Sequence, residues 1–430
     1  MTQIEIHNFG PIRDAKIDIK PMLVLIGPQA SGKSTVAKLI YFFETLPEDL
    51  YAELLSNKES KITIDFLSEI IKKKFTKLFA YPKNFDIKCT ICNLKWIRIY
   101  ETNNQLSIEL HPQFLEYHKN DVALNTLKDN LLNMDSMDVE RQIILSQIKQ
   151  KTKQLFANNH DDVLYAIAGR SMTVNYSYTF NELFKQNLYQ HINTDVETSD
   201  ETLMYNFMKR VSRMKDLMRR ENDFEKLLSV ANPTSKPTLE LANDLILKIL
   251  HGKYTIENDV ERIIHPNGSV YLNEASSGQQ EAIRILQDAF LGIYQGNNLF
   301  RIVEEPEAHL FPEAQKATIE LLTLALNNKN DNNLIITTHS PYTLTVINNL
   351  IFAAKVGKIS PEKVKEIVPE TLWLPTERVA AYLLKDGTAE NIIDDELGEI
   401  KAEMIDEVSI ILNQEYDNIY DIRYEATKSA

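Results

Sequence analysis

Short apolar runs separate longer segments of helical periodicity in several parts of the chain. Residues 22–26, 299–304 and 334–338 are three such runs, and each predicts a buried strand. Between the last two runs, apolar residues recur at helical spacing over residues 313–326. A strand, a helix and a strand in short succession predict parallel pairing, because parallel strands need a crossover connection. The pattern therefore predicts an α/β fold with a mixed sheet flanked by helices.

Alternating apolar and polar residues predict antiparallel strands elsewhere. Residues 85–110 hold three alternating runs with a turn at Asn103-Asn104, which predicts a meander. Residues 15–19 alternate in the same way, and we expect them to form a half-exposed edge strand next to residues 4–6. These segments predict an antiparallel β-subdomain beside the mixed sheet. Two further hairpins are predicted at residues 262–272 and 379–393.

Helical periodicity dominates the middle of the chain, and an apolar strand at residues 163–168 interrupts it. We therefore expect residues 113–250 to be a large, mainly helical insertion or arm, with residues 1–112 and 251–430 forming one head. An acidic helix is predicted over residues 397–412. The helix after Ser276 is predicted to be amphipathic, with one apolar side made of Ala282, Ile285, Leu286, Ala289, Phe290 and Ile293.

The overall composition is that of a globular protein, with 43% hydrophobic and 25% charged residues among 430. No apolar run is long enough to cross a membrane and no signal segment is recognisable, so we expect a cytoplasmic protein with no membrane partner. Two cysteines provide no disulfide framework. Cys89 and Cys92 have C-x-x-C spacing, but a zinc site needs a second pair of ligands, which favours a core residue and an incidental one.

The net charge of −14 argues against a protein that coats nucleic acid with its whole surface, although a local basic groove remains compatible with it. The most basic stretch is residues 209–220. If it is helical, Lys209, Arg213 and Arg220 share one face. A solvated helix face and a contact with DNA, RNA or a partner protein both account for this pattern.

A phosphate-binding loop follows the first apolar run. Glycines in a G-x-x-x-x-G-K-S loop let backbone N–H groups surround a phosphate, and the next helix directs its positive end at the same group. The Lys33 ammonium can reach the β- and γ-phosphates, and the Ser34 hydroxyl suits Mg²⁺. We therefore expect ATP and Mg²⁺ as ligands. The expected contacts are Gly27, Pro28, Gln29, Ala30, Ser31, Gly32, Lys33, Ser34 and Thr35.

Three further groups provide what hydrolysis needs. Glu304 and Glu305 end an apolar strand, where Glu304 can hold the Mg²⁺ shell through water and Glu305 can deprotonate the attacking water. His339 follows another strand and can contact the γ-phosphate. The Ser-Ser-Gly-Gln turn of Ser276, Ser277, Gly278 and Gln279 opens a helix and predicts a second anion site. If both helices flank one sheet, this turn serves the nucleotide of a second subunit arranged head to tail.

These motifs together resemble those of ABC-type ATPases: the P-loop, the signature at Ser277–Gln280, the Walker B and D-loop string at Glu304–His309, and the switch histidine. Within that class the chain is similar to the SMC/RecF/OLD-like branch, over about the first 40 residues and residues 255–395. The E-E-P-E-A-H-L-x-P and T-T-H-S-P strings resemble the overcoming-lysogenization-defect (OLD) ATPase domain, which also occurs in antiphage modules such as PtuA of Septu and retron systems and AriA of PARIS. The resemblance implies an ABC-type P-loop ATPase head.

Two residues depart from the family pattern. Glu304 stands where many relatives have Asp, and Arg301 interrupts an otherwise apolar strand, which indicates either an edge position or a buried partner. OLD proteins carry a C-terminal Toprim nuclease, whereas the segment after His339 is expected only to complete the ATPase sheet. Asp394-Asp-Glu396 is expected to be a turn at a helix start, not a metal site.

The resemblance implies a homodimer or higher homo-oligomer with composite ATP sites. We expect this ATPase to be the sensor or regulator subunit of an antiphage defence system that controls a separate effector, which we expect to be a nuclease, without being a nuclease itself. The alternative is a DNA-maintenance ATPase of RecF or SMC type that clamps DNA.

Overall fold

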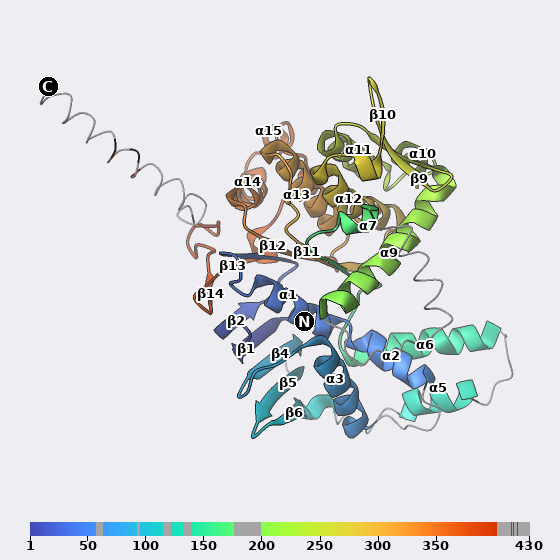
Figure 1. Ribbon diagram of the computed structural model, residues 1–430, viewed down its shortest axis with the longest axis vertical. Coiled ribbons are helices and arrows are strands. Elements are labelled where there is room, and N and C mark those ends of the chain that lie inside the picture. Colours follow the sequence, from blue (N-terminus) through green and yellow to red (C-terminus); the bar gives the residue numbers. More distant parts are fainter. Residues whose placement is uncertain are drawn as a thin grey trace, which may run out of the picture.

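A computed structural model describes residues 1–56, 63–92, 95–114, 122–132, 139–175, 199–401, 414, 416 and 419. In this part of the chain, eleven strands form one mixed sheet in the order β6-β5-β4-β1-β2-β14-β13-β3-β12-β11-β7 (Figure 1). Its strands are β1 (Gln3–Phe9), β2 (Ile12–Asp18), β3 (Met22–Ile26), β4 (Asp86–Cys92), β5 (Lys95–Thr102), β6 (Gln105–Leu110), β7 (Asp162–Ala166), β11 (Leu299–Glu304), β12 (Asn333–Thr338), β13 (Val379–Lys385) and β14 (Thr388–Asn391).

The predicted parallel pairing of residues 299–304 with residues 334–338 is confirmed, since β11 pairs with β12. The third apolar run, β3, pairs in parallel with the other side of β12. Successive side chains of β3 enter two different cores, because neighbouring residues of a strand point to opposite faces. Met22, Val24 and Ile26 belong to one core, and Leu23 and Leu25 belong to the other. This burial on both faces explains why β3 is apolar at every position.

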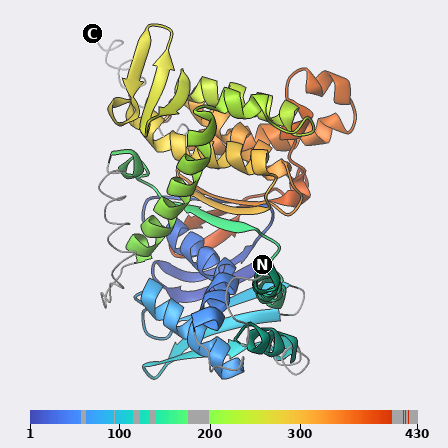
Figure 2. The ribbon, with the colours of Figure 1, turned by 90° about the vertical axis from the view of Figure 1, so that its right-hand side faces the viewer.

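Helices cover both faces of the sheet (Figures 1 and 2). One face carries α1 (Lys33–Glu44), α2 (Leu46–Ser56) and α3 (Ile64–Leu78), with α5 (Val122–Leu132) and α6 (Val139–Leu155) beside the antiparallel strands. The other face carries α9 (Ser199–Glu221), α10 (Phe224–Ser229), α11 (Lys236–Leu250), α12 (Ser277–Gln295), α13 (Pro312–Asn327) and α14 (Pro341–Gly357), followed by the short α15 (Pro361–Lys365).

The segments expected to be an insertion contribute to the head in several places. β7 is the last strand of the sheet and pairs in parallel with β11. Leu239, Leu245 and Ile249 of α11 are buried in the same core as α12 and α13. The division into a head and an insertion at residues 113–250 stays a prediction.

The predicted antiparallel segments form, but their places in the sheet differ from expectation in one case. The meander β4-β5-β6 turns at Asn103 and Asn104, both with positive φ, and it continues the main sheet through β1. The prediction that residues 15–19 form an edge strand is wrong, because β2 lies between β1 and β14. Asp14 pairs with Thr388, and the N–H groups of Arg13 and Asp14 donate to the Gly387 carbonyl just before β14. The exposed side chains of β2 therefore do not mark a free edge.

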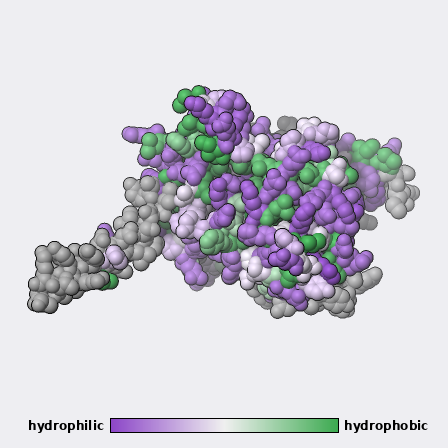
Figure 3. Space-filling view, turned by 90° about the horizontal axis from the view of Figure 1, so that it is seen from above, coloured by the Kyte–Doolittle hydropathy of each residue, from purple (hydrophilic) through white to green (hydrophobic). Residues whose placement is uncertain are grey.

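The C-terminal acidic helix was predicted to start at Leu397. Residues 397–401 are not helical, since Ile400 forms an isolated bridge with Ile393 and Lys401 donates its N–H to the Ile392 carbonyl. The rest of that prediction, residues 402–412, lies outside the described residues. None of the described helices has the length and apolar character needed to cross a membrane. On the face seen in Figure 3, apolar side chains are interspersed among polar ones.

Helix α12 has the predicted apolar side, but it is buried nearly all round. Its polar side is covered by other elements, and Glu281, Arg284, Gln287 and Asp288 are all buried. The Arg301 guanidinium of β11 lies 2.6 Å from Asp288. Of the two explanations for an arginine in this apolar strand, the structure therefore supports the buried partner. The same carboxylate accepts hydrogen bonds from Arg210 of α9. Polar residues on α12 thus mark contacts inside the protein, not a solvent face.

A three-stranded antiparallel sheet lies beyond α12, in the order β10-β9-β8. Its strands are β8 (Lys253–Glu257), β9 (Val260–His265) and β10 (Gly268–Tyr271), which include the predicted hairpin. Glu261 of β9 is buried between Arg284 of α12, at 2.5 Å, and Lys215 of α9, at 2.6 Å. Burial alone would raise the pKa of Glu261, but the two cations outweigh it and hold that pKa at about 2.

Glu261 is expected to make stability depend on pH. Its folded pKa of about 2 lies below the value of about 4.3 for an unfolded glutamate, so its contribution is present above pH 4.3 and is lost as pH falls towards 2. At pH 7, Glu261→Gln is expected to lower the free energy of unfolding by about 3–5 kcal/mol, because it leaves two buried cations without their carboxylate. Urea unfolding at several pH values measures this difference.

The exposed Glu257→Gln on β8 is the matched control and is expected to unfold like the unsubstituted protein. The difference in the free energy of unfolding between Glu261→Gln and this control should become smaller as pH falls from 4.3 to 2. A difference that stays constant over that range would contradict the assignment.

Candidate active site

The phosphate-binding loop lies between β3 and α1, near the centre of the sheet (Figure 1). A Cβ on Gly27 would lie 2.1 Å from the Leu384 carbonyl oxygen of β13, so only glycine fits there. Gly32 has φ +103° and caps α1 without a side-chain hydrogen bond. The first N–H groups of α1 have no intrahelical acceptors, as at any helix start. This end of α1 is therefore suited to bind an anion.

The Lys33 ammonium is held inside this loop. It donates to the carbonyls of Gly27, at 2.9 Å, and Pro28, at 2.8 Å, and the residue is only 5% exposed. Burial lowers the pKa of Lys33, and the carboxylates of Glu305, Glu307 and Glu304 oppose that effect. A bound phosphate would replace the two neutral carbonyls as the acceptor for Lys33. Because the phosphate is an anion, it would favour the charged form of this side chain.

The two carboxylates predicted at the end of β11 have different surroundings. Glu304 is buried, with one oxygen accepting from the Tyr165 hydroxyl at 2.9 Å and the other from the Ala168 N–H at 3.2 Å. Glu305 has a half-exposed side chain and a φ of +44°, which is strained for a residue with a side chain. The protein therefore holds Glu304 rigidly and presents Glu305 to the open side of the site.

His339 connects the loop lysine to the second carboxylate. Its Nδ1 lies 3.5 Å from Lys33 Nζ, and its Nε2 lies 3.2 Å from Glu305 Oε1. The three predicted catalytic residues, which come from three distant parts of the chain, thus meet at the ends of β3, β11 and β12. The position of His339 follows from the parallel pairing of these strands, whose carboxyl ends share one edge of the sheet.

Glu307 belongs to this site, although no role was predicted for it. Its Oε1 accepts from the Thr338 hydroxyl, at 2.5 Å, and from the His339 N–H, at 2.9 Å. Its Oε2 is buried and has no partner in the described part of the chain. In the sequence, the third carboxylate of the E-E-P-E string is the feature that could have indicated a role for Glu307. Through these bonds, Glu307 ties the segment after β11 to the main chain at His339.

The residues present fit a nucleotide with Mg²⁺. The Ser31 hydroxyl in the loop is buried and lacks a partner among the described residues, as does Glu307 Oε2, so the site holds polar atoms that a ligand or its water can satisfy. Ser34 is exposed at the start of α1. Because both Glu304 oxygens already accept hydrogen bonds, a role for Glu304 at Mg²⁺ is better suited to contact through water. These ligand assignments stay predictions.

The predicted signature turn has the local structure of a helix start. Ser276 caps α12: its hydroxyl accepts from the Gln279 N–H, and Gln279 Oε1 accepts from the Ser276 N–H. Ser276 and Ser277 are exposed, while a Cβ on Gly278 would lie 2.6 Å from the His309 carbonyl oxygen. In the described part of the chain, no hydrogen bond links residues 276–279 to residues 27–35.

A comparison with protein families now adds to this geometry. The family described as AAA ATPase domain matches residues 1–344. The chain belongs to this family. It is therefore a P-loop NTPase whose family uses ATP and Mg²⁺. A comparison with curated proteins gave no match for this AAA ATPase domain.

Among solved structures, the chain is similar to SMC head domains and to RecF at low sequence identity. One is an SMC head bound to the C-winged helix domain of ScpA, with 12% identity, 91% of this chain and 96% of that chain covered, and a TM-score of 0.41. An SMC head domain from Thermotoga maritima has 10% identity, coverage of 91% and 97%, and a TM-score of 0.36. The recombination mediator protein RecF has 11% identity, coverage of 91% and 97%, and a TM-score of 0.33.

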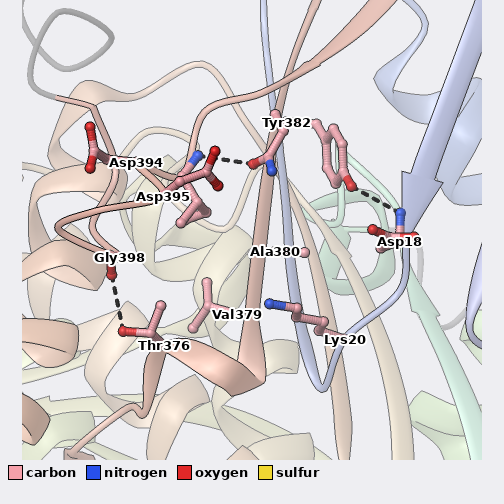
Figure 4. A pocket seen from close by; sticks show the side chains of 11 residues that line it. Asp18, Lys20, Thr376, Val379, Ala380, Tyr382, Asp394, Asp395 and Gly398 are labelled. Atoms are coloured by element: carbon pink, nitrogen blue, oxygen red, sulfur yellow. Dashed lines mark hydrogen bonds between the residues drawn. The ribbon is translucent and has the colours of Figure 1, made fainter.

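A separate pocket of about 230 Å³ lies beside β13, between the end of β2 and the turn after β14 (Figure 4). The Tyr382 hydroxyl accepts from the Asp18 N–H at 3.0 Å, and Lys20 also lines the pocket. Asp394 accepts from the N–H groups of Leu397 and Glu396, which lower its pKa. These bonds confirm the predicted turn at residues 394–396, and no catalytic group of the nucleotide site lines this pocket.

Proposed function

We propose that this AAA ATPase domain binds ATP at residues 27–35 and hydrolyses it. The observation that carries the proposal is the position of His339, whose ring nitrogens lie 3.5 Å from Lys33 Nζ and 3.2 Å from Glu305 Oε1. Lys33 and the N–H groups of α1 would hold the phosphates, His339 would contact the γ-phosphate, and Glu305 would orient and deprotonate the attacking water. Bound Mg²⁺ would neutralise phosphate charge, with Ser34 and Glu304 at its shell.

We further propose that the active form is a homodimer, or a higher homo-oligomer, with composite sites. Support comes from the exposed hydroxyls of Ser276 and Ser277, which make no hydrogen bond to the described P-loop of their own chain. A helix start with free N–H groups is a suitable partner for a γ-phosphate. In a head-to-tail pair, each subunit would offer this turn to the nucleotide of the other.

The biological role that we propose is regulation of an antiphage effector, most simply a nuclease, encoded as a separate protein. Its support is the resemblance of the strings at Glu304–His309 and Thr337–Pro341 to OLD-type ATPase domains. ATP-dependent closure of two heads would provide two states, and an effector that prefers one state is coupled to nucleotide binding by the same free energy in both directions.

The experiment for this role uses the purified chain with ATP, Mg²⁺ or Mn²⁺, and DNA or RNA. We expect ATP hydrolysis and no cleavage of nucleic acid, because the catalytic groups described above all serve one nucleotide. Cleavage that survives Lys33→Ala but is lost on replacing Asp394 and Glu396 would overturn the proposal and assign a nuclease to the C-terminal segment.

The alternative function, a DNA clamp of RecF or SMC type, is favoured by one observation on α9. Two of the six basic residues in the stretch at 209–220 are used inside the protein: Arg210 bonds to Asp162 and Asp288, and Lys215 bonds to Glu261. Arg213 lies 3.6 Å from Asp162, but its side chain is 62% exposed, and Arg220 is exposed as well, so both side chains are accessible to nucleic acid.

Reversing both charges, in Arg213→Glu with Arg220→Glu, tests this surface. We expect duplex DNA binding to weaken and the salt dependence of its affinity to become shallower by about two counterions, because each lost phosphate contact releases about one fewer. Fluorescence anisotropy over a salt series measures both. The control, Lys358→Glu with Lys363→Glu, makes the same charge change at two exposed positions, one before α15 and one within it. Equal binding by the two double variants would assign the α9 face to solvent.

A further inference from the structure

Arg170 and Arg284 are the largest completely buried side chains among the described residues, and Arg170 lies in the loop after β7. Its guanidinium donates to four main-chain carbonyls: Ile167 at 2.8 Å, Glu304 at 2.5 Å, Glu305 at 3.1 Å and Glu281 at 3.2 Å. Two of these carbonyls belong to the paired carboxylates of the active site. The side chain thus fixes the backbone that carries the proposed catalytic base, without touching the nucleotide loop.

Glu281 connects the same loop to α12. Its carboxylate accepts from the N–H groups of Arg170, at 2.9 Å, and Ser171, at 3.1 Å. Glu281 lies one helical turn after Ser277, so this connection is made at the end of α12 that carries the signature turn. Gly278, three residues earlier, packs against the His309 carbonyl. The start of α12 is therefore joined to both ends of the segment at residues 304–309.

Arg170 differs from the other buried arginines of this region. Arg284 and Arg301 each direct their guanidinium at a carboxylate, of Glu261 and Asp288 respectively. Arg170 Nε lies 3.7 Å from the nearest carboxylate oxygen of Glu281, and the hydrogen bonds of its guanidinium go to carbonyls instead. This arrangement specifies the position of the peptide groups around Glu305, whose φ of +44° needs support from its surroundings.

We propose that Arg170 is a positioning residue that couples the signature helix α12 to Glu305, an inference that rests on the proposed ATPase function. When a second subunit engages the signature turn, a shift of α12 passes through Glu281 and the loop at Arg170 to the carbonyls of Glu304 and Glu305. Hydrolysis then depends on closure, because the position of α12 influences the position of the peptide groups that carry the base.

The test compares Arg170→Lys with Arg301→Lys. Both arginines are buried and both contact α12, but the Arg301 side chain does not reach the active site. Lysine keeps the charge and loses the planar fork that spans several carbonyls. We expect Arg170→Lys to lower kcat roughly 10- to 100-fold, the loss that follows from a small misplacement of a catalytic group. The Kd for ATP and the Tm should stay close to those of Arg301→Lys.

This split between kcat and Kd distinguishes positioning from structural damage, which would also lower the Tm and weaken ATP binding. If Arg170→Lys does not fold, Glu281→Gln replaces it: one of two acceptor oxygens is lost, and we expect kcat to fall roughly 5- to 10-fold at unchanged Kd. A kcat equal to that of Arg301→Lys in the variant tested would overturn the coupling. Absence of hydrolysis by the unsubstituted protein would instead overturn the proposed ATPase function.

Discussion

Replacing Glu305 with glutamine is expected to lower ATP hydrolysis by about 10²- to 10⁴-fold while ATP still binds. The substitution keeps the shape of the side chain and its hydrogen bonding to His339 Nε2, but removes the carboxylate that would accept the proton of the attacking water. Lys33 and the N–H groups of α1 are unchanged, so nucleotide affinity should be preserved. Phosphate release and the binding of a fluorescent ATP analogue measure the two quantities separately.

Two variants complete this experiment. Lys33→Ala should weaken nucleotide binding itself, because it removes the loop cation and leaves the hydrolytic groups in place. Glu240→Gln, on the exposed face of α11, makes the same chemical change as Glu305→Gln far from the site and should hydrolyse ATP normally. Unchanged turnover by Glu305→Gln would exclude Glu305 as the base.

Ser277→Arg is expected to abolish hydrolysis by blocking the closed dimer. Ser277 is exposed at the first position of α12, so the substitution adds a bulky cation where the γ-phosphate of the partner subunit would bind, with little effect on folding. Each of Ser277→Arg and Lys33→Ala should therefore be inactive when it is alone.

Mixing these two inactive variants should restore activity. In a heterodimer, one composite site combines the intact loop of the Ser277→Arg subunit with the intact turn of the Lys33→Ala subunit. Random pairing in an equal mixture gives about a quarter of the wild-type number of intact sites, since half of the dimers are mixed and each mixed dimer has one good site. No recovery in mixtures whose subunits demonstrably exchange would contradict the trans arrangement.

The sequence predicted most of the strands because strand formation follows from local periodicity. Residues 22–26 are apolar at every position since both faces of β3 are buried, and that information lies within the segment itself. The order of the strands in the sheet, in contrast, depends on segments that are far apart in the chain. Nothing within residues 15–19 indicates that β14, more than 360 residues later, lies beside β2, so alternation was interpreted as an edge.

Polar residues on buried elements are a second case in which the local sequence does not indicate the neighbours of a segment. The side of α12 that carries Glu281, Arg284 and Asp288 has the sequence pattern of a solvent face, and Arg301 is unexpected in an apolar strand. Both observations have one cause, because charged groups on elements distant in sequence neutralise each other when the helices pack. The identity of a buried partner is a property of the folded chain.

The sequence by itself determined the chemistry of this protein: a P-loop with Lys33, two carboxylates at a strand end, and His339 after another strand, each recognisable because phosphate binding requires fixed residue types at fixed spacing. Only the tertiary structure decided how these groups meet. The parallel pairing of β3, β12 and β11 brings Lys33, His339 and Glu305 together, Glu307 holds the main chain at His339, and Arg170 holds the carbonyls of Glu304 and Glu305. Those last contacts join segments more than 30 residues apart through single side chains, and no periodicity in a sequence encodes them.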